Sequence, residues 1–345
     1  MNFLSKSKHQ NYNNYQIIYK NKKLFKTNVV FILSSLGLVG CGGGGSDNTT
    51  NTNINLPSSG NLSLLTGSVV KGPLNNALVF ADYDGDGIFD SDEPSTRTAA
   101  DGSFSLQSAV PGAGFVAIAD ESTTDSFTNS PITGVTLKAP AGATVVTPAT
   151  TLFVEVKEKN PDIQTTELAS ALGLDDINIL EFNPFSEGVD PTKALEAEKV
   201  SSQIITTLTS ISAAGEGAGA SKEIAYEKAL DAITAVVTTK IQSSNENNNS
   251  AQTTKIDFSD DTLLSEVNVA AKDELATVVD SKDALNTVLD TSITAIKNVN
   301  EKIDTAKSLT DKESVAAFTV TNQLTEQVKT AVEAEVQNPG SSEIN

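Results

Sequence analysis

The segment from Asp82 to Glu93 holds the residues whose types and spacing best suit a defined chemistry. Counted from Asp82, carboxylates occupy positions 1, 3, 5, 9 and 12, and a glycine occupies position 6. This spacing matches the acidic loop D-x-D-x-D-G-x5-E, which wraps oxygen ligands around Ca²⁺. The sequence therefore predicts a calcium site. Its expected ligands are the side chains of Asp82, Asp84, Asp86, Asp90 and Glu93 and the backbone carbonyl of Ile88.

Each position in this segment has an expected role. The alternate carboxylates point inward as the loop winds, and Glu93 closes the shell with two oxygens. Gly87 permits the positive φ of the tight bend, which a β-carbon would resist. Mg²⁺ is disfavoured because it demands octahedral geometry at shorter distances. The alternative is a solvated acidic loop without an ion, since Asp-Gly pairs are common in turns.

Short β-rich runs surround the acidic segment and must position it. They are separated by turn signals and lie at residues 68–70, 77–81, 103–106, 115–119 and 135–138. Short strands at this spacing predict an antiparallel β-sandwich over residues 65–140. The run before the segment favours a strand, and Pro94 directly after it blocks an immediate helix. The helix–loop–helix arrangement of an EF-hand is therefore not expected.

The stretch from Gly67 through Leu106 resembles the calcium-loaded B-type repeats of bacterial surface proteins, called SdrD-B-like or Cna-B-like. Their order of strand, acidic loop and T-x-x-x-G-x-F is matched by Thr98, Gly102 and Phe104. The resemblance implies a prealbumin-like or Ig-like sandwich in which calcium staples a loop. Some of these repeats also carry a Lys–Asn isopeptide bond. Lys71 is the only lysine near the first strand, and we expect no such bond here.

The N-terminal region has the features of an export signal. Residues 1–40 contain six lysines and no carboxylate, and they end in an apolar run at 29–39. The run is too short to span a bilayer, so residues 1–40 are predicted to be a signal peptide. Leu38-Val39-Gly40-Cys41 resembles the lipobox of bacterial lipoproteins, whose cysteine is lipidated and becomes the mature N-terminus. This implies a membrane anchor at Cys41 and, with Gly42 after it, sorting to the bacterial outer membrane. The alternative is an ordinary signal peptide with a chance cysteine.

The remaining chain divides into a tether and a helical domain. Residues 41–64 are rich in Gly, Ser, Asn and Thr and predict a flexible tether. After Pro140 the apolar period shifts toward 3.6, which predicts an all-α helical bundle over residues 141–345. The predicted fold class is thus α+β and multidomain.

Local signals in the helical domain mark helix ends. Thr147-Pro148 and Asp190-Pro191 should begin helices, and a capping box of Thr310 and Glu313 should open the last one, through about Val336. Residues 215–219, which contain three glycines, are expected to form a turn between two helices.

Composition excludes several functions. The chain carries 24 basic and 44 acidic residues, and without residues 1–40 the balance is 18 against 44, a net charge of −26. Such a chain repels nucleic acid, so no nucleic-acid partner is expected. The only histidine is His9 and the only cysteine is Cys41, which excludes histidine-based catalysis or metal sites in the mature chain and an internal disulfide.

These observations predict a non-enzymatic, lipid-anchored, calcium-binding surface protein that serves as an adhesin or an envelope scaffold. Its partner at the cell surface would be an unidentified protein or glycan. A glycan-binding module and a polysaccharide hydrolase with paired carboxylates are the alternatives. Both usually stack aromatic side chains on sugars, and this chain has no tryptophan.

Overall fold

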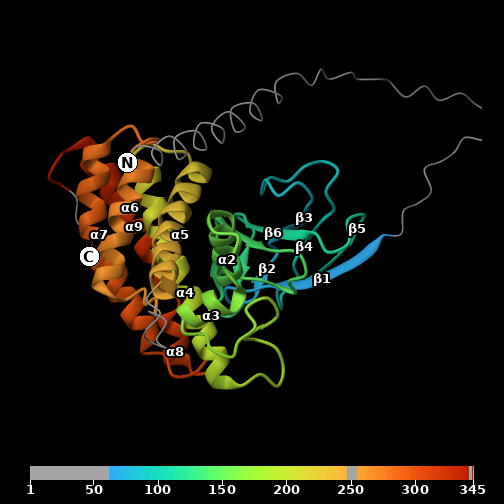
Figure 1. Cartoon of the computed structure of the whole chain (residues 1–345). Helices are drawn as coiled ribbons and strands as arrows, with labels where there is room; N and C mark the ends of the chain where they lie inside the picture. The colour runs from blue at the N-terminus through green and yellow to red at the C-terminus, as the bar shows by residue number, and fades with distance from the viewer. Residues whose placement is uncertain (1–61, 247–254, 342–343, 345) are drawn as a thin grey trace, which may run out of the picture. The chain divides into compact units, whose positions relative to one another are not determined.

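The computed structural model of the chain describes residues 62–246, 255–341 and 344 (Figure 1). The predicted signal peptide, Cys41 and nearly all of the predicted tether lie outside the described residues. Strands occupy the first part of this range, through Val146, and helices follow from Pro148. The prediction of a β region followed by an α-helical region is confirmed.

The described strands form three small sheets. The first has the order β10-β1-β5, in which β1 runs antiparallel to β5 and parallel to β10; its strands are β1 (Ser63–Val69), β5 (Ser103–Ser108) and β10 (Val145–Val146). The second has the order β2-β7-β8 and comprises β2 (Leu74–Asn75), β7 (Thr124–Asp125) and β8 (Ser130–Pro131). The third is antiparallel with the order β4-β3-β6-β9, from β3 (Leu78–Asp82), β4 (Ser95–Arg97), β6 (Gly114–Ala119) and β9 (Val135–Ala139).

Side-chain alternation explains how these strands pack. In β5, Phe104 and Leu106 are buried while Ser105 and Gln107 face solvent, the pattern of a strand covered on one face. Phe104 meets Phe115 of β6 edge-to-face at 5.0 Å, so the first and third sheets touch through aromatic side chains. All five strands expected from the sequence are present. The β structure also continues past Pro140, because Val145 and Val146 pair with β1.

The described helices are α2 (Pro148–Lys159), α3 (Thr165–Ala171), α4 (Pro191–Gly217), α5 (Lys222–Glu246), α6 (Asp261–Leu275), α7 (Lys282–Asp304), α8 (Lys312–Ala317) and α9 (Val320–Gln337). Two predicted starts are confirmed. The Thr147 side chain accepts the backbone N–H of Thr150, and Asp190 accepts those of Thr192 and Lys193. Each bond satisfies an amide that the first helical turn would leave unpaired.

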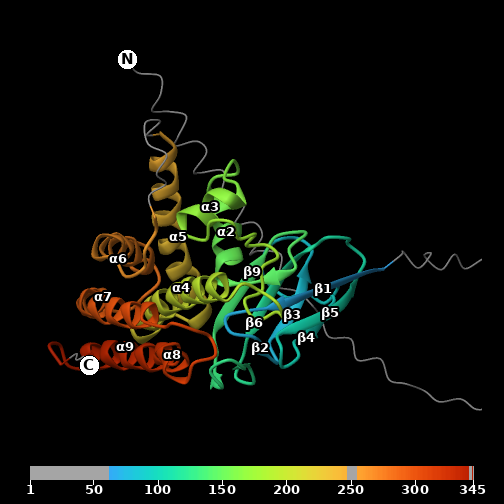
Figure 2. The same ribbon diagram turned by 90° about the horizontal axis from the view of Figure 1, so that it is seen from below.

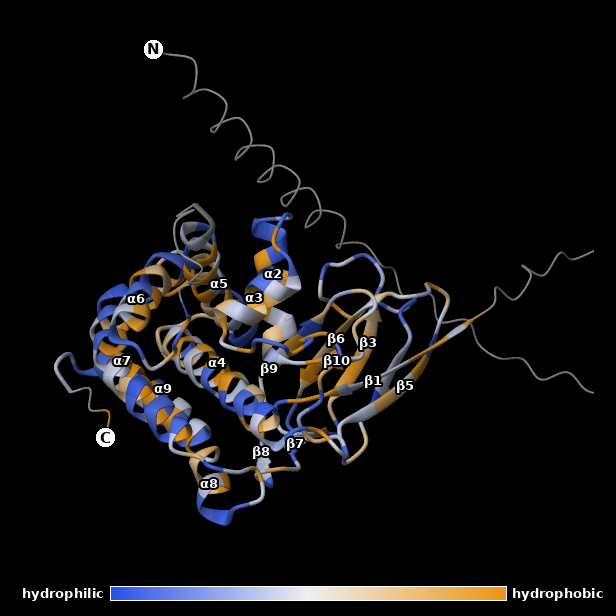
Figure 3. Ribbon diagram, turned by 60° about the horizontal axis from the view of Figure 1, so that its bottom comes forward, coloured by the Kyte–Doolittle hydropathy of each residue, from blue (hydrophilic) through white to orange (hydrophobic). Residues whose placement is uncertain are grey.

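Helix α4 lies at the centre of the helical region and packs against α5, α7 and α9 (Figure 2). Hydrophobic and hydrophilic residues alternate along α7 and α9 (Figure 3), as expected for helices with one buried face. Helix α2 packs against both β9 and α5. One cluster of buried side chains includes Val79 and Phe115 from strands and Leu208 and Val332 from helices.

The expected start of the last helix was wrong. Asp311, not Thr310, caps α8 by accepting the N–H of Ser314, and α8 ends after six residues. Phe318 follows α8 with its ring buried at 5.4 Å from that of Phe127, and α9 begins at Val320.

The expected turn is confined to Ala218 and Gly219, and the glycines at 215 and 217 take no part in it. They lie inside α4, which ends only at Gly217. A β-carbon at Gly215 would lie 2.7 Å from Leu275 Cδ2, and one at Gly217 would lie 2.8 Å from the Lys329 carbonyl oxygen. These glycines therefore allow α6 and α9 to approach α4 closely. Among the described residues, no helix is long and apolar enough to cross a membrane.

Candidate metal site

The acidic segment forms a loop between two strands of the third sheet. Strand β3 ends at Asp82 and β4 begins at Ser95, so the loop is flanked by strands, as predicted, and not by EF-hand helices. Phe89 anchors the middle of the loop, since its ring lies 5.4 Å from that of Phe80 in β3. The two strands therefore fix both ends of the loop, and this aromatic contact fixes its centre.

Three predicted ligands converge. Each of Asp82, Asp84 and Asp86 offers a carboxylate oxygen, and these oxygens lie within 4.8 Å of one another. Calcium binds oxygen at about 2.3–2.6 Å, so two oxygens on one ion can be up to about 5 Å apart. The three carboxylates could therefore hold a metal ion.

Backbone amides hold these carboxylates in place. Asp82 accepts the N–H of Gly85 at 2.7 Å and that of Gly87 at 3.0 Å. Asp86 accepts the N–H of Ile88 at 2.8 Å. The chain can turn this tightly because Gly85 and Gly87 have φ angles of +77° and +74°, which confirms the role expected for Gly87.

The two other carboxylates predicted as ligands, those of Asp90 and Glu93, lie outside the cluster of three aspartates. Glu93 is buried, and its two carboxylate oxygens accept the N–H groups of Tyr83 at 2.7 Å and Asp90 at 2.9 Å. The residue thus ties the start of the loop to its end. The Asp90 carboxylate does not join the cluster, and the Ile88 side chain is exposed.

A lysine from strand β9, which lies beyond β6 in the third sheet, comes close to the loop. A β-carbon at Gly87 would be 3.5 Å from the Lys138 ammonium, which forms an ion pair of 2.8 Å with Glu155. Burial alone would lower the pKa of Lys138, but the Glu155 carboxylate raises it above its usual value. Lys138 therefore stays charged and provides a fixed positive charge beside the acidic loop.

The sequence analysis missed a second group of ionisable residues. Lys71, Asp125 and Glu198 are buried together where the β region meets α4. Two local signals were available: Lys71 stands between Val70 and a Gly-Pro pair, and Glu198 falls on the apolar face of α4. Their proximity could not be inferred, because more than a hundred residues separate the first from the last.

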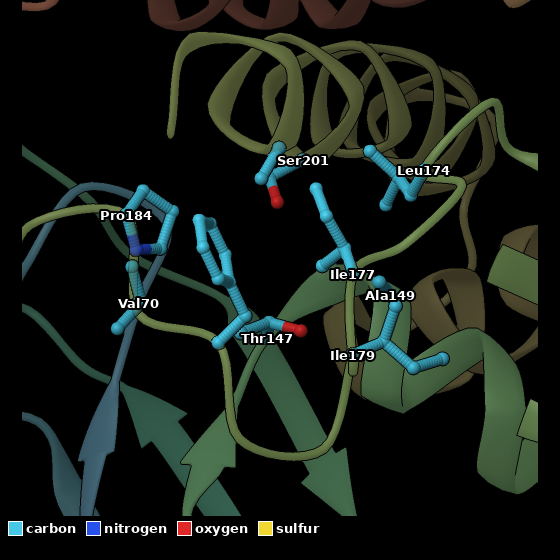
Figure 4. Close-up of a pocket in the computed structure, with 10 residues that line it drawn as sticks. Val70, Thr147, Ala149, Leu174, Ile177, Ile179, Pro184 and Ser201 are labelled. Atoms are coloured by element: carbon cyan, nitrogen blue, oxygen red, sulfur yellow. The ribbon is translucent and has the colours of Figure 1, made fainter. Parts of the chain in front are cut away.

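A small cavity is lined in part by Val70 and Ala197, the sequence neighbours of Lys71 and Glu198 (Figure 4). Its lining is mostly apolar, with Thr147 and Ser201 as its hydroxyl groups, and its volume is about 20 Å³. This is room for about one water molecule. The cavity is therefore too small to be a substrate site.

Comparison with protein families, curated proteins and solved structures finds no significant match. The function must therefore be argued from the residues of this chain.

Proposed function

We propose that the loop from Asp82 to Glu93 binds one Ca²⁺ ion and that the ion stabilises the β region. The observation that carries the proposal is the convergence of Asp82, Asp84 and Asp86 within 4.8 Å. All three offer hard oxygen ligands, and the chain has no histidine near the loop that would favour a softer metal.

Calcium fits this loop for two further reasons. Six carboxylates lie between Asp82 and Glu93, and their mutual repulsion opposes the compact loop unless a cation offsets it. An ion that binds only the folded loop adds its binding free energy to the stability of the fold. The contact between Phe104 and Phe115 supports the finer proposal that the sheets form a prealbumin-like or Ig-like sandwich. In this sandwich the bound calcium would hold the loop in place.

The test is thermal unfolding of the chain in EDTA and in millimolar Ca²⁺. The proposal predicts a melting temperature several degrees higher in Ca²⁺, and Asp86→Ala should abolish that rise. Asp92→Asn is the matched control, because it removes one negative charge from the same loop outside the aspartate cluster, and it should retain the rise. Equal melting of the unsubstituted chain in both solutions would refute the proposal.

We further propose that the protein is exported, anchored to the bacterial outer membrane through a lipidated Cys41, and acts as an adhesin or envelope scaffold. The support is the lipobox-like sequence before Cys41 and the excess of acidic residues in the mature chain. Cys41→Ser should release the protein from the membrane fraction. Unchanged membrane association of this variant would contradict the anchor.

A further inference from the structure

Strand β1 has an uncovered edge in the part of the chain that the structure describes. On one side, β5 runs along β1 over almost its whole length, from Ser63 to Ser68. On the other side, β10 pairs only with Ser68 and Val69, at the end of the strand. The first half of β1 therefore has a neighbouring strand on one side only, which leaves a backbone edge open for pairing.

The open edge presents the backbone groups of Leu64 and Thr66. The Ser68 N–H donates to the Thr144 carbonyl, on the side where β10 lies. Backbone groups alternate between the two sides of a strand, so every second residue before Ser68 faces that same side. Leu64 and Thr66 thus offer N–H and carbonyl groups with which a further strand can pair.

The side chains along this edge are apolar and uncharged. Leu64 is 66% exposed, and Leu62, one residue before the strand, is 57% exposed. Figure 3 shows the outer part of β1 as hydrophobic. Edge strands are normally protected from pairing by charged residues, proline or a bulge, but residues 62–70 contain no charged residue and no proline. The outward side chains of β5, in contrast, are the polar Ser105 and Gln107.

We propose that two copies of the chain pair through this edge, β1 against β1 in antiparallel orientation, so that one sheet continues across the dimer. Charge favours a second copy as the occupant. Without residues 1–40 the chain has a net charge of −26, so most contacts between two copies bring carboxylates together. The edge of β1 is a stretch where two copies meet without that repulsion, and each copy supplies the uncharged extended segment that the other edge accepts.

The extent of the open edge selects the register of the pairing. A two-fold axis beside Leu64 sets this residue opposite its own copy and sets Leu62 opposite the partner's Thr66. Every open backbone group of this stretch then has a partner. An axis one residue later would set Leu62 opposite Ser68, whose N–H already donates to the Thr144 carbonyl. The register centred on Leu64 leaves β10 in place.

The dimer should be weak and should become stronger with salt. Pairing over residues 62–66 buries much less than the roughly 1,200–2,000 Å² of a stable interface, and the acidic surfaces of the two copies repel. Salt screens this repulsion but leaves the backbone pairing and the leucine contact intact. A contact held by ion pairs would respond to salt in the opposite direction.

Disulfide formation at the two-fold axis tests the register. The tests use a Cys41→Ser background, which removes the only cysteine of the chain. In the proposed dimer the two copies of residue 64 have Cα atoms about 5.5 Å apart, within the range of about 4.4–6.8 Å that a disulfide spans. Leu64→Cys should therefore form a covalent dimer under mild oxidation.

Gln107→Cys is the matched control for this cross-link. Gln107 lies directly opposite Leu64 in β5, so its side chain points to the same face of the sheet. Across the dimer the two copies of Gln107 would be about 14 Å apart, since neighbouring strands are about 4.8 Å apart, and this variant should stay monomeric. No cross-linking of Leu64→Cys, equal cross-linking of both variants, or cross-linking only to other proteins would overturn the proposal.

Sedimentation equilibrium of the same Cys41→Ser chain measures the association without a cross-link. The dimer fraction should increase between about 0.05 M and about 0.5 M NaCl. Leu64→Lys should raise the dissociation constant at least about tenfold, because like charges directly opposite each other destabilise strand pairing. Gln107→Lys adds the same charge to the neighbouring strand and should retain the association. A chain that is monomeric at every concentration and salt would overturn the proposal, whatever the variants do.

Discussion

Both carboxylate oxygens of Glu198 lie 3.1 Å from the backbone nitrogen of Gly72, although 126 residues separate the two positions. The contact fixes the first half of α4 against the turn that follows β1. Because Glu198 is completely buried, ionisation of its carboxyl group costs free energy. This cost lowers the stability of the interface between the helical and β regions.

Stability should therefore fall as the pH rises through neutrality. Burial raises the folded-state pKa of Glu198 from 4.5 to about 7. A raised pKa contributes stability that is fully present below the unfolded value and is lost as the pH rises through the folded value. The free energy of unfolding should drop by about 2–3 kcal/mol between pH 5 and pH 9.

Urea denaturation at both pH values measures this loss. Glu198→Gln serves as the control, since it cannot ionise, and its loss over the same range should be smaller by that amount. Parallel pH profiles for the two proteins would contradict a buried, titrating Glu198.

Tyr83 should report directly on the metal site. It is the second residue of the acidic loop, beside Asp82, and its hydroxyl lies 3.0 Å from that of Ser108. Tb³⁺ is also a hard cation that binds oxygen ligands, and a nearby tyrosine sensitises its luminescence. We expect luminescence on excitation of tyrosine that Ca²⁺ displaces.

The matched variant is Tyr83→Phe, which loses one hydroxyl and about 1 kcal/mol of stability. It should lose most of the luminescence yet keep the rise in melting temperature with Ca²⁺. Luminescence of undiminished strength in this variant would show that Tb³⁺ binds elsewhere.

Gly217→Ala should destabilise the helical region more than Gly215→Ala. At Gly217 the new β-carbon meets the Lys329 backbone carbonyl, which cannot move without shifting α9, whereas at Gly215 it meets the end of the Leu275 side chain. Overpacking costs about 1–3 kcal/mol, and the better helix propensity of alanine offsets about 1 kcal/mol of it. Urea denaturation of both variants checks the order, and equal stabilities would contradict the close packing of α4 against α9.

Structural features that depend only on residues close together in the sequence could be predicted. The spacing of Asp82, Asp84 and Asp86 predicts a shared cation because each turn of the loop brings the next carboxylate to the same side. The helix starts at Pro148 and Pro191 were predictable because a cap acts within three residues. Pro94 predicted in the same way that no helix follows the acidic loop directly, but the short strand β4 at Ser95–Arg97 was not predicted.

Features that depend on distant parts of the chain were not predictable. The loop pattern predicts Glu93 as a ligand, but it does not show that the Glu93 carboxylate also accepts the backbone N–H groups of Tyr83 and Asp90. At the break between α8 and α9, the Phe318 ring contacts Phe127, which lies 191 positions earlier in the sequence. Lys71 and Glu198 are likewise brought together only by the packing of α4 on the β region, which the sequence does not show.

Calcium titration calorimetry of the chain, after removal of bound metal with EDTA, tests the central proposal most directly. We predict saturable binding of one Ca²⁺ per chain, absent in the double variant Asp82→Ala/Asp86→Ala and preserved in Asp92→Asn. No saturable binding by the unsubstituted chain, or equal binding by the double variant, would contradict calcium binding by the Asp82–Glu93 loop.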